Sequence, residues 1–351
     1  ARDSSYTGYV EKGLGTALLV SNGLDGSRSH AWIRYLRRSD SVLVQDTLRP
    51  YTIDSVAFLL GVIARDSSVK NLRLRLYKLP ATADTAPTFA QLDALLTPDN
   101  VIDSVVVPDT IVSGIRRVLL TGDQLARVAL DEEDEGVLRL GVDMAADGPT
   151  GTRIGALASG GFTPLYVTYV TAEVEDTALR QQIITRGTDR TTWASEAADP
   201  TPTDGVLIVG GAPSYRTLLR FDWPARFRDS VSIVRARLEL LPTATVPGLA
   251  PDTAILQARA IIADLGAKSP ILSGLTLESK VPAGTSDTVK LNVGTLVGQW
   301  QGDNARPPAI FLSLSPEASS FSVFSLGSSL DPDRVARIRL TYVLRFPFES
   351  P

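Results

Sequence analysis

The sequence contains no cysteine, one histidine and one methionine. Without cysteine there is no disulfide framework, and with one histidine a zinc site would depend almost entirely on carboxylate ligands, which is unusual for zinc. A cytosolic chain of this length ordinarily keeps a few cysteines, so their absence favours a secreted or cell-surface protein. The chain also begins at Ala1 rather than at methionine, and we take this as a sign that a signal peptide has been removed.

Strong charge and long apolar runs are also missing. The net charge is −4, and the clustered Lys and Arg that nucleic acid or an anionic membrane would require are absent. No apolar run approaches the roughly 20 residues that span a bilayer. Apolar residues make up 44% of the 351 positions and charged residues 21%, which is typical of folded globular chains. The length suffices for two domains of ordinary size.

The segments that carry structure alternate apolar and polar residues with a period of two, the pattern of half-buried antiparallel strands. Arginines occupy the polar positions of residues 72–77, 234–240 and 337–344. Rows of this kind usually form the solvated face of a strand, and an anionic polymer is the alternative ligand. The 27 glycines and 22 prolines supply turns at short intervals. We therefore expect an all-β protein with few short helices.

The strand patterns occur twice in the same order, which predicts two homologous domains in tandem. The sequence predicts two jelly-roll-type β-sandwich domains of the same topology. The matching pairs are 15–20 with 204–209, 32–35 with 218–221, 72–76 with 234–238, and 165–170 with 338–343.

The repeat also suggests boundaries. We expect an extended N-terminal segment at 1–14, a first sandwich at 15–170, a linker at 171–203, a second sandwich at 204–343 and an extended tail at 344–351. The first domain has more residues after its second strand than the second domain has, which predicts an additional hairpin between Arg34 and Arg65. Short helices are expected at 86–96, at 121–130 with Asp123 as N-cap, and at 293–300.

The second repeat resembles a known family. Leu218-Leu219-Arg220-Phe221-Asp222, the alternating strand at 233–241, Val289–Trp300 and the closing Ile338–Val343 are similar to DNRLRE-type modules of secreted bacterial proteins. The first repeat matches more loosely and has Ala129 where the second has Trp300. The resemblance implies jelly rolls similar in layout to carbohydrate-binding modules, with roles in attachment, display or the cell surface.

Nothing in the sequence assembles into a catalytic centre, so we expect no enzyme activity, no cofactor and no metal. His30 lies in a turn-like segment without a nucleophile elbow and is interpreted as a turn residue. The acidic run 131–135 lacks the ligand spacing of a known calcium loop, so a solvated connection is favoured over a calcium site. Asp331 and Asp333 are expected in a turn, and no spacing singles out a carboxylate pair for glycoside hydrolysis.

The four tryptophans are the candidate sugar contacts. Trp32 and Trp300 lie in apolar-patterned segments and are expected in cores, whereas Trp193 and Trp223 lie near loops and are free to stack on a sugar ring.

The favoured function is a non-catalytic extracellular subunit that assembles with itself into a filament, sheath or surface layer by strand addition. The alternative is a secreted carbohydrate-binding or adhesion module, with polysaccharide as partner. The expected connector is the tail, where Leu344, Phe346 and Phe348 continue the alternation of the last strand. The competing interpretation is that this tail folds back on its own domain. The alternative donor is the N-terminal segment with Tyr6, Tyr9 and Val10.

Overall fold

The computed structural model describes residues 3–83, 85–196, 202–203, 205–250, 252–303 and 305–345. The chain divides into two compact units. The first domain is Lys12–Ala198, and the second domain combines Ala1–Glu11 with Asp199–Pro351. The N-terminal segment therefore belongs to the second domain rather than standing apart. The expected linker is also wrong, because most of 171–203 forms part of the first domain.

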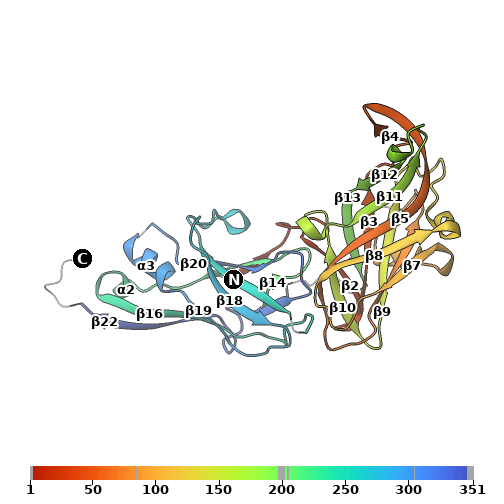
Figure 1. Ribbon diagram of the computed structural model, residues 1–351. Helices are drawn as coiled ribbons and strands as arrows, with labels where there is room; N and C mark the ends of the chain where they lie inside the picture. The colour runs from red at the N-terminus through yellow and green to blue at the C-terminus, as the bar shows by residue number, and fades with distance from the viewer. Residues whose placement is uncertain are drawn as a thin grey trace. The chain divides into compact units, whose positions relative to one another are not determined.

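The first domain is a curled antiparallel sheet of 12 strands (Figure 1). Its main path runs β12-β11-β5-β10-β2-β3-β9-β6-β7, with β13 paired to β3 and with β4 and β8 paired to β5. The strands are β2 (Ala17–Leu24), β3 (Ser27–Tyr35), β4 (Ser41–Val44), β5 (Thr47–Arg65), β6 (Arg73–Leu79), β7 (Val101–Val106), β8 (Gly114–Thr121), β9 (Arg139–Ala145), β10 (Thr150–Gly155), β11 (Leu165–Ala172), β12 (Gln181–Arg186) and β13 (Thr188–Ser195).

The second domain has three antiparallel sheets, ordered β1-β15-β20-β17-β18, β14-β21 and β19-β16-β22. Its first strand, β1 (Ser4–Tyr6), comes from the beginning of the chain. The others are β14 (Val206–Gly210), β15 (Arg216–Arg220), β16 (Val231–Leu240), β17 (Thr253–Ala260), β18 (Leu277–Pro282), β19 (Val289–Asn292), β20 (Ala309–Ser315), β21 (Val323–Gly327) and β22 (Arg337–Leu344).

The two domains pair their strands in the same order. In the first domain β2 pairs with β10, β3 with β9, β9 with β6, β6 with β7, and β5 with β8 and β11. In the second, β14 pairs with β21, β15 with β20, β20 with β17, β17 with β18, and β16 with β19 and β22. This correspondence confirms the expected all-β class and makes each domain a sandwich of the same connectivity.

The pairing corrects one of the four sequence matches. Residues 72–76 lie in β6, next to β9 and β7, whereas 234–238 lie in β16, between β19 and β22. The counterpart of β16 is β5, and that of β6 is β17. Both pairs of strands alternate apolar and polar residues, so periodicity alone could not assign them. The expected additional hairpin is present as β4 and the start of β5, which pair from Ser41 to Pro50.

One glycine in each domain illustrates the correspondence. Gly155 ends β10 and Gly327 ends β21, at the same position of the repeat. A Cβ atom on Gly155 would lie 1.9 Å from the backbone oxygen of Phe162, and one on Gly327 would lie 2.6 Å from Cβ of Arg334. In both domains the segment after this strand packs so closely against it that only glycine fits.

The helices are short, as expected. Thr88 caps the first α-helix in a capping box with Gln91. The stretch at 121–130 is a 3₁₀ turn whose N-cap is Thr121, so the prediction of Asp123 as N-cap was wrong. The helices are α1 (Phe89–Asp93), α2 (Arg226–Asp229) and α3 (Gly294–Gly302), and the 3₁₀ turns are η1 (Pro98–Asn100), η2 (Gly122–Val128), η3 (Gly160–Phe162), η4 (Thr177–Leu179) and η5 (Gly266–Lys268).

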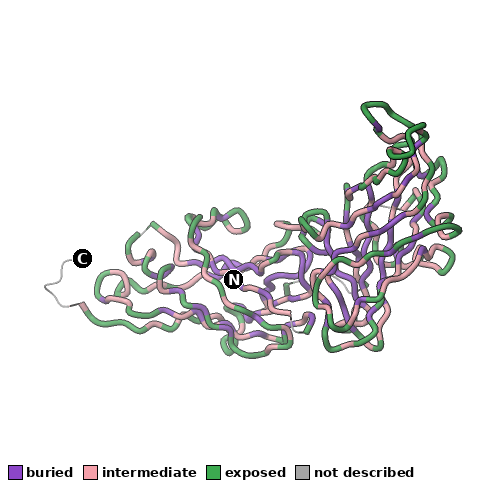
Figure 2. The backbone as a smooth tube through the Cα atoms, viewed as in Figure 1, coloured by how far each residue is buried: buried purple, intermediate pink, exposed green. Residues whose placement is uncertain are grey.

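Each domain has its own core, seen as the buried inner strands in Figure 2. In the first domain the rings of Tyr35, Phe58 and Tyr166 pack together, with centroids 5.5 to 6.1 Å apart. In the second, Trp300 of α3 is buried in the main cluster and contacts the rings of Phe221 and Trp223. The indole thus fixes α3 to the sheet.

We expect Trp300→Ala to destabilise the second domain by about 3–5 kcal/mol, because a large buried aromatic side chain is lost and a cavity remains. Hydrogen exchange followed by mass spectrometry should show lost protection confined to the second domain, in residues 205–345 and in the N-terminal segment 3–10 that pairs with it. Val234→Ala, at a side chain 67% exposed, is the control and should change stability by less than about 0.5 kcal/mol. Unchanged protection around α3 in Trp300→Ala would contradict this role.

Candidate functional site

The N-terminal segment is docked on the second domain. β1 pairs antiparallel with β15, with Ser4 opposite Leu218, Ser5 opposite Thr217 and Tyr6 opposite Arg216. β15 pairs with β20 on its other side. We call this contact the β1 dock: residues 3–10 together with the parts of β14, β15, β20 and the following loops that they touch.

A cycle of hydroxyl hydrogen bonds lies at the centre of the β1 dock. The Ile208 N–H donates to Ser5 Oγ at 2.8 Å, and Thr217 Oγ1 donates to the Ile208 carbonyl at 2.7 Å. Ser5 Oγ and Thr217 Oγ1 are 2.7 Å apart. Since Thr217 uses its proton on Ile208, Ser5 donates to Thr217. The Ser5 hydroxyl of β1 therefore bonds the backbone N–H of Ile208 in β14 directly. It also bonds the Thr217 hydroxyl of β15, which in turn bonds the Ile208 carbonyl.

Asp3 fixes the start of the dock. Its buried carboxylate accepts from the N–H of Arg220 at 3.0 Å and from the N–H of Ser329 at 3.1 Å. Hydrogen bonds to a charged group contribute roughly 1.5–3 kcal/mol each, about twice a neutral bond. The position of β1 is therefore specified by a side chain as well as by backbone pairing.

Two tyrosines of the segment supply its apolar contacts. Tyr6 and Tyr9 pack on a buried cluster that includes Leu218 and Phe311. The ring of Tyr9 meets Phe311 edge to face, its hydroxyl donates to the Ala267 carbonyl at 2.7 Å, and the Arg216 guanidinium lies 4.1 Å above it. Burial raises the pKa of Tyr9, and Arg216 opposes that shift. The phenol therefore stays neutral and continues to donate its hydrogen bond.

Two charged pairs fix the part of the second domain on which β1 lies. Arg216 makes two hydrogen bonds of 2.7 Å to the Glu317 carboxylate. Arg220 binds Asp264 at 2.6 and 2.9 Å, which lowers the pKa of Asp264, and the backbone N–H of Gly266 lowers it further. Val10 completes the segment by accepting from the Ser214 N–H at 2.9 Å.

Most of the expected C-terminal connector lies outside the described residues. Leu344 ends β22 and is 72% exposed, while Phe346 and Phe348 lie outside the described residues. Within the described residues β22 pairs only with β16. Of the two donor segments considered from the sequence, the N-terminal one with Tyr6, Tyr9 and Val10 is the segment that the structure shows docked.

A second feature is a polar hollow of about 600 Å³ in the first domain, which we call the His30 hollow. His30 is not a turn residue, because it lies buried in β3, stacked on Phe89, with Nε2 2.9 Å from Asp93. The signal that the sequence analysis missed is its position two residues before the core residue Trp32, on the alternating pattern of the same strand.

The acids of the His30 hollow are paired with neighbouring cations. Arg75 donates to both oxygens of Asp143, through Nε at 2.8 Å and through one terminal nitrogen at 2.5 Å, and the Tyr77 hydroxyl donates to the same carboxylate at 3.2 Å. Burial, followed by the charge of Asp143, raises the pKa of Tyr77 to about 12. Arg28 pairs with Asp93 and with Glu196. These polar groups hold one another in fixed positions around the hollow.

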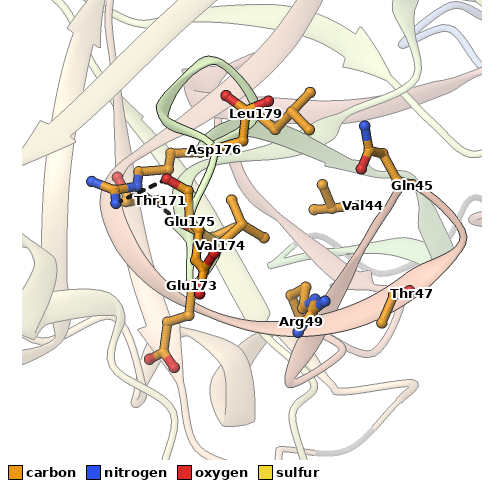
Figure 3. Close-up of a pocket in the computed structure, with 12 residues that line it drawn as sticks. Val44, Gln45, Thr47, Arg49, Thr171, Glu173, Val174, Glu175, Asp176 and Leu179 are labelled. Carbon is orange, nitrogen blue, oxygen red and sulfur yellow. Dashed lines mark hydrogen bonds between the residues drawn. The ribbon is translucent and has the colours of Figure 1, made fainter.

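A wider groove of about 860 Å³ lies between the β4–β5 hairpin and the segment 171–180 (Figure 3). Arg49 lines one wall, and Glu173 and Asp176 lie on the other. The polar groups of this second wall serve its own turns: Arg180 donates to the Val174 carbonyl at 2.9 Å, and Asp176 accepts from a backbone N–H. We assign no chemistry to this groove.

The tryptophans expected to be free are not free. Trp193, a candidate sugar contact, lies in β13 and is only 7% exposed, with Lys12 over its ring, so the expectation of a free ring near a loop was wrong. Trp223 is partly buried and packs on the core of the second domain, 5.4 Å from the ring of Trp300. Trp32 and Trp300 are buried, as expected.

The acidic segments fold as turns. Asp134 of the run 131–135 is buried and pairs with Lys78 at 2.7 Å, so this connection is less solvated than expected. Asp331 accepts from the backbone of Asp333 and Arg334. In the described part of the chain no group of three or more His, Cys, Asp or Glu side chains is arranged to hold a metal ion. Among the same residues, no helix is long and apolar enough to cross a membrane.

The Arg220–Asp264 pair predicts a dependence on acid. Because the folded pKa of Asp264 is lowered, its stabilising contribution is present above about pH 4 and is lost as the pH falls through the folded value. We expect the free energy of unfolding of the second domain to fall less steeply below pH 4 in Asp264→Asn than in the unaltered chain. Asp46→Asn, at an exposed turn, is the control. Equal slopes for all three proteins would contradict this assignment.

The chain was compared with known proteins in three ways. A scan against protein-family models, a search of the curated proteins and a search of the solved structures each found no match.

Proposed function

We propose that this protein is a non-catalytic, secreted or cell-surface structural subunit that assembles with itself by strand addition. The observation that carries the proposal is the β1 dock, in which a short terminal segment completes the edge of a sandwich. Main-chain pairing supplies the affinity of such contacts, and side-chain pockets supply their specificity. Ser5, Asp3 and Tyr9 provide those side-chain contacts here.

The composition supports an extracellular setting. A chain with no cysteine has no thiol to oxidise outside the cell. The pattern of the second repeat, similar to DNRLRE-type modules, agrees with a role in attachment or display. The charged side chains of the His30 hollow pair with one another, an arrangement suited to structure rather than to proton transfer. We accordingly propose no cofactor and a second copy of the chain as the main partner.

Weakening the β1 dock should prevent assembly. We expect the unaltered protein to form multimers or fibres when concentrated, seen by light scattering after size exclusion and by negative-stain electron microscopy. Asp3→Ala combined with Tyr9→Ala should shift it to single chains, because a buried carboxylate bridge and a packed ring are lost. Ile183→Ala, 64% exposed on β12, is the control and should assemble normally. Single chains at every concentration of the unaltered protein would refute the proposed function.

Polysaccharide binding is the second candidate, and the His30 hollow is the observation that favours it. A hollow of this size, with arginine, carboxylate and phenol groups in fixed positions, offers donors and acceptors to sugar hydroxyls. The His30 hollow belongs to the first domain and the β1 dock belongs to the second, so sugar binding and assembly use different surfaces and are compatible.

Affinity electrophoresis in gels containing a panel of polysaccharides tests this candidate. If the hollow binds sugar, Arg75→Ala should reduce retention at least tenfold, since it frees Asp143 from its partner and removes two donors. Arg73→Ala, on the same strand and exposed, is the matched control and should leave retention unchanged. No retention of the unaltered protein on any polysaccharide would eliminate this function.

A further inference from the structure

We propose that β1 completes the second domain of a neighbouring copy of this chain, so that copies join head to tail. The proposal rests on the proposed function and deepens it by naming the donor and the acceptor. The donor is the segment 3–10, and the acceptor is the outer edge of β15. Another strand, β13, occupies the corresponding place on the first domain.

β13 and β1 are structural counterparts. β13 pairs antiparallel with β3, and β1 pairs antiparallel with β15, the counterpart of β3. β13 lies on the edge of β3 opposite β9, and β1 lies on the edge of β15 opposite β20. Trp193 is opposite Ala31 and Ser5 is opposite Thr217; since the repeat equates Ala31 with Thr217, Ser5 corresponds to Trp193. The same edge is therefore filled in the same direction in both domains.

A side-chain contact supports the same register independently. By this alignment Asp3 corresponds to Thr191. Asp3 accepts from the backbone N–H of Ser329, and Thr191 Oγ1 accepts from the backbone N–H of Leu157 at 3.0 Å. Ser329 and Leu157 each lie two residues beyond the glycine that ends β21 or β10. An added strand with a capping side chain at this position is thus part of the repeat, and not an accident of one terminus.

The order of the strands in the chain identifies the donor of each domain. β13 immediately precedes the second domain and completes the domain before it, the first. β1 immediately precedes the first domain. The connections to the next strand are equal in length, residues 7–16 after β1 and 196–205 after β13. By the same rule β1 completes a domain other than the first, and the β15 edge in the second domain of another copy is the matching acceptor.

Exchange of this kind leaves every contact of the β1 dock unchanged. A strand that pairs with its own chain and one that pairs with a neighbour make the same hydrogen bonds, so concentration and the connecting segment decide between them. Donor and acceptor are different surfaces of the chain. A contact between different surfaces continues from copy to copy unless its rotation closes a ring, and it therefore produces filaments.

A cysteine pair distinguishes exchange from a closed chain, because the natural sequence has no cysteine to interfere. Ser5 and Thr217 face each other across the dock, with oxygens 2.7 Å apart. Ser5→Cys and Thr217→Cys are made in separate full-length chains, one with a size tag. They are unfolded, mixed, refolded together and oxidised. Exchange predicts a disulfide-linked dimer that contains both variants, and a ladder of multimers from the double variant.

The matched control is Ser27→Cys with Ser195→Cys, whose oxygens are 3.0 Å apart across β3 and β13. This pair lies within the first domain and should form its disulfide inside one chain. If the Ser5–Thr217 double variant also forms only a disulfide within one chain while fibres are visible, exchange of β1 is refuted, and self-assembly stands but through another contact. If it does so without any assembly, both are refuted.

A variant that leaves the dock intact provides a second test should the cysteine substitutions disturb folding. Inserting a flexible Gly/Ser stretch between Glu11 and Lys12 makes it easier for β1 to reach its own second domain. Exchange predicts that the multimers decrease in favour of single chains at a fixed concentration. An unchanged proportion of multimers would overturn the proposal, since the connection would then have no part in assembly.

Discussion

The backbone groups along the outer edge of β15 need hydrogen-bond partners, and the organisation of the second domain depends on how they are satisfied. β1 supplies those partners, although it lies more than 200 residues before β15 in the sequence. Its short length limits the number of backbone bonds it can make. Side chains therefore supply much of the contact between β1 and the domain: the Asp3 carboxylate, the Ser5 hydroxyl and the Tyr9 ring each contact a different element.

The two domains share a connectivity but have diverged in the layers around it. The second domain covers its sheet with α3 and buries Trp300, whereas the first has the 3₁₀ turn η2 at that place. The first domain instead adds the exposed β4–β5 hairpin and the strand β12, which pairs with the outer edge of β11. Insertions of this kind are tolerated because they extend edges without changing the strands that form the core.

The charged groups of both domains follow one rule, because a buried or half-buried charge is stable only with a partner. Asp143 is held by Arg75 and Tyr77, Asp93 by Arg28, and Arg216 by Glu317. Such pairs fix the walls of the His30 hollow and of the β1 dock. Paired charges of this kind keep the side chains of both surfaces in fixed positions.

The sequence by itself determined the all-β class, the duplication and the burial of Trp32 and Trp300, because period-two patterns and apolar runs report which residues face a core. Only the tertiary structure decided which strands pair. The structure pairs β6 with β9 and β7 and pairs β16 with β19 and β22, so the counterpart of β6 is β17 and that of β16 is β5. It also places β12 and β13 within the expected linker and buries Trp193. Alternation specifies that a segment is a strand and which face is apolar, but not its neighbour. The place of β1 depends on a partner more than 200 residues away, on which local sequence carries no information.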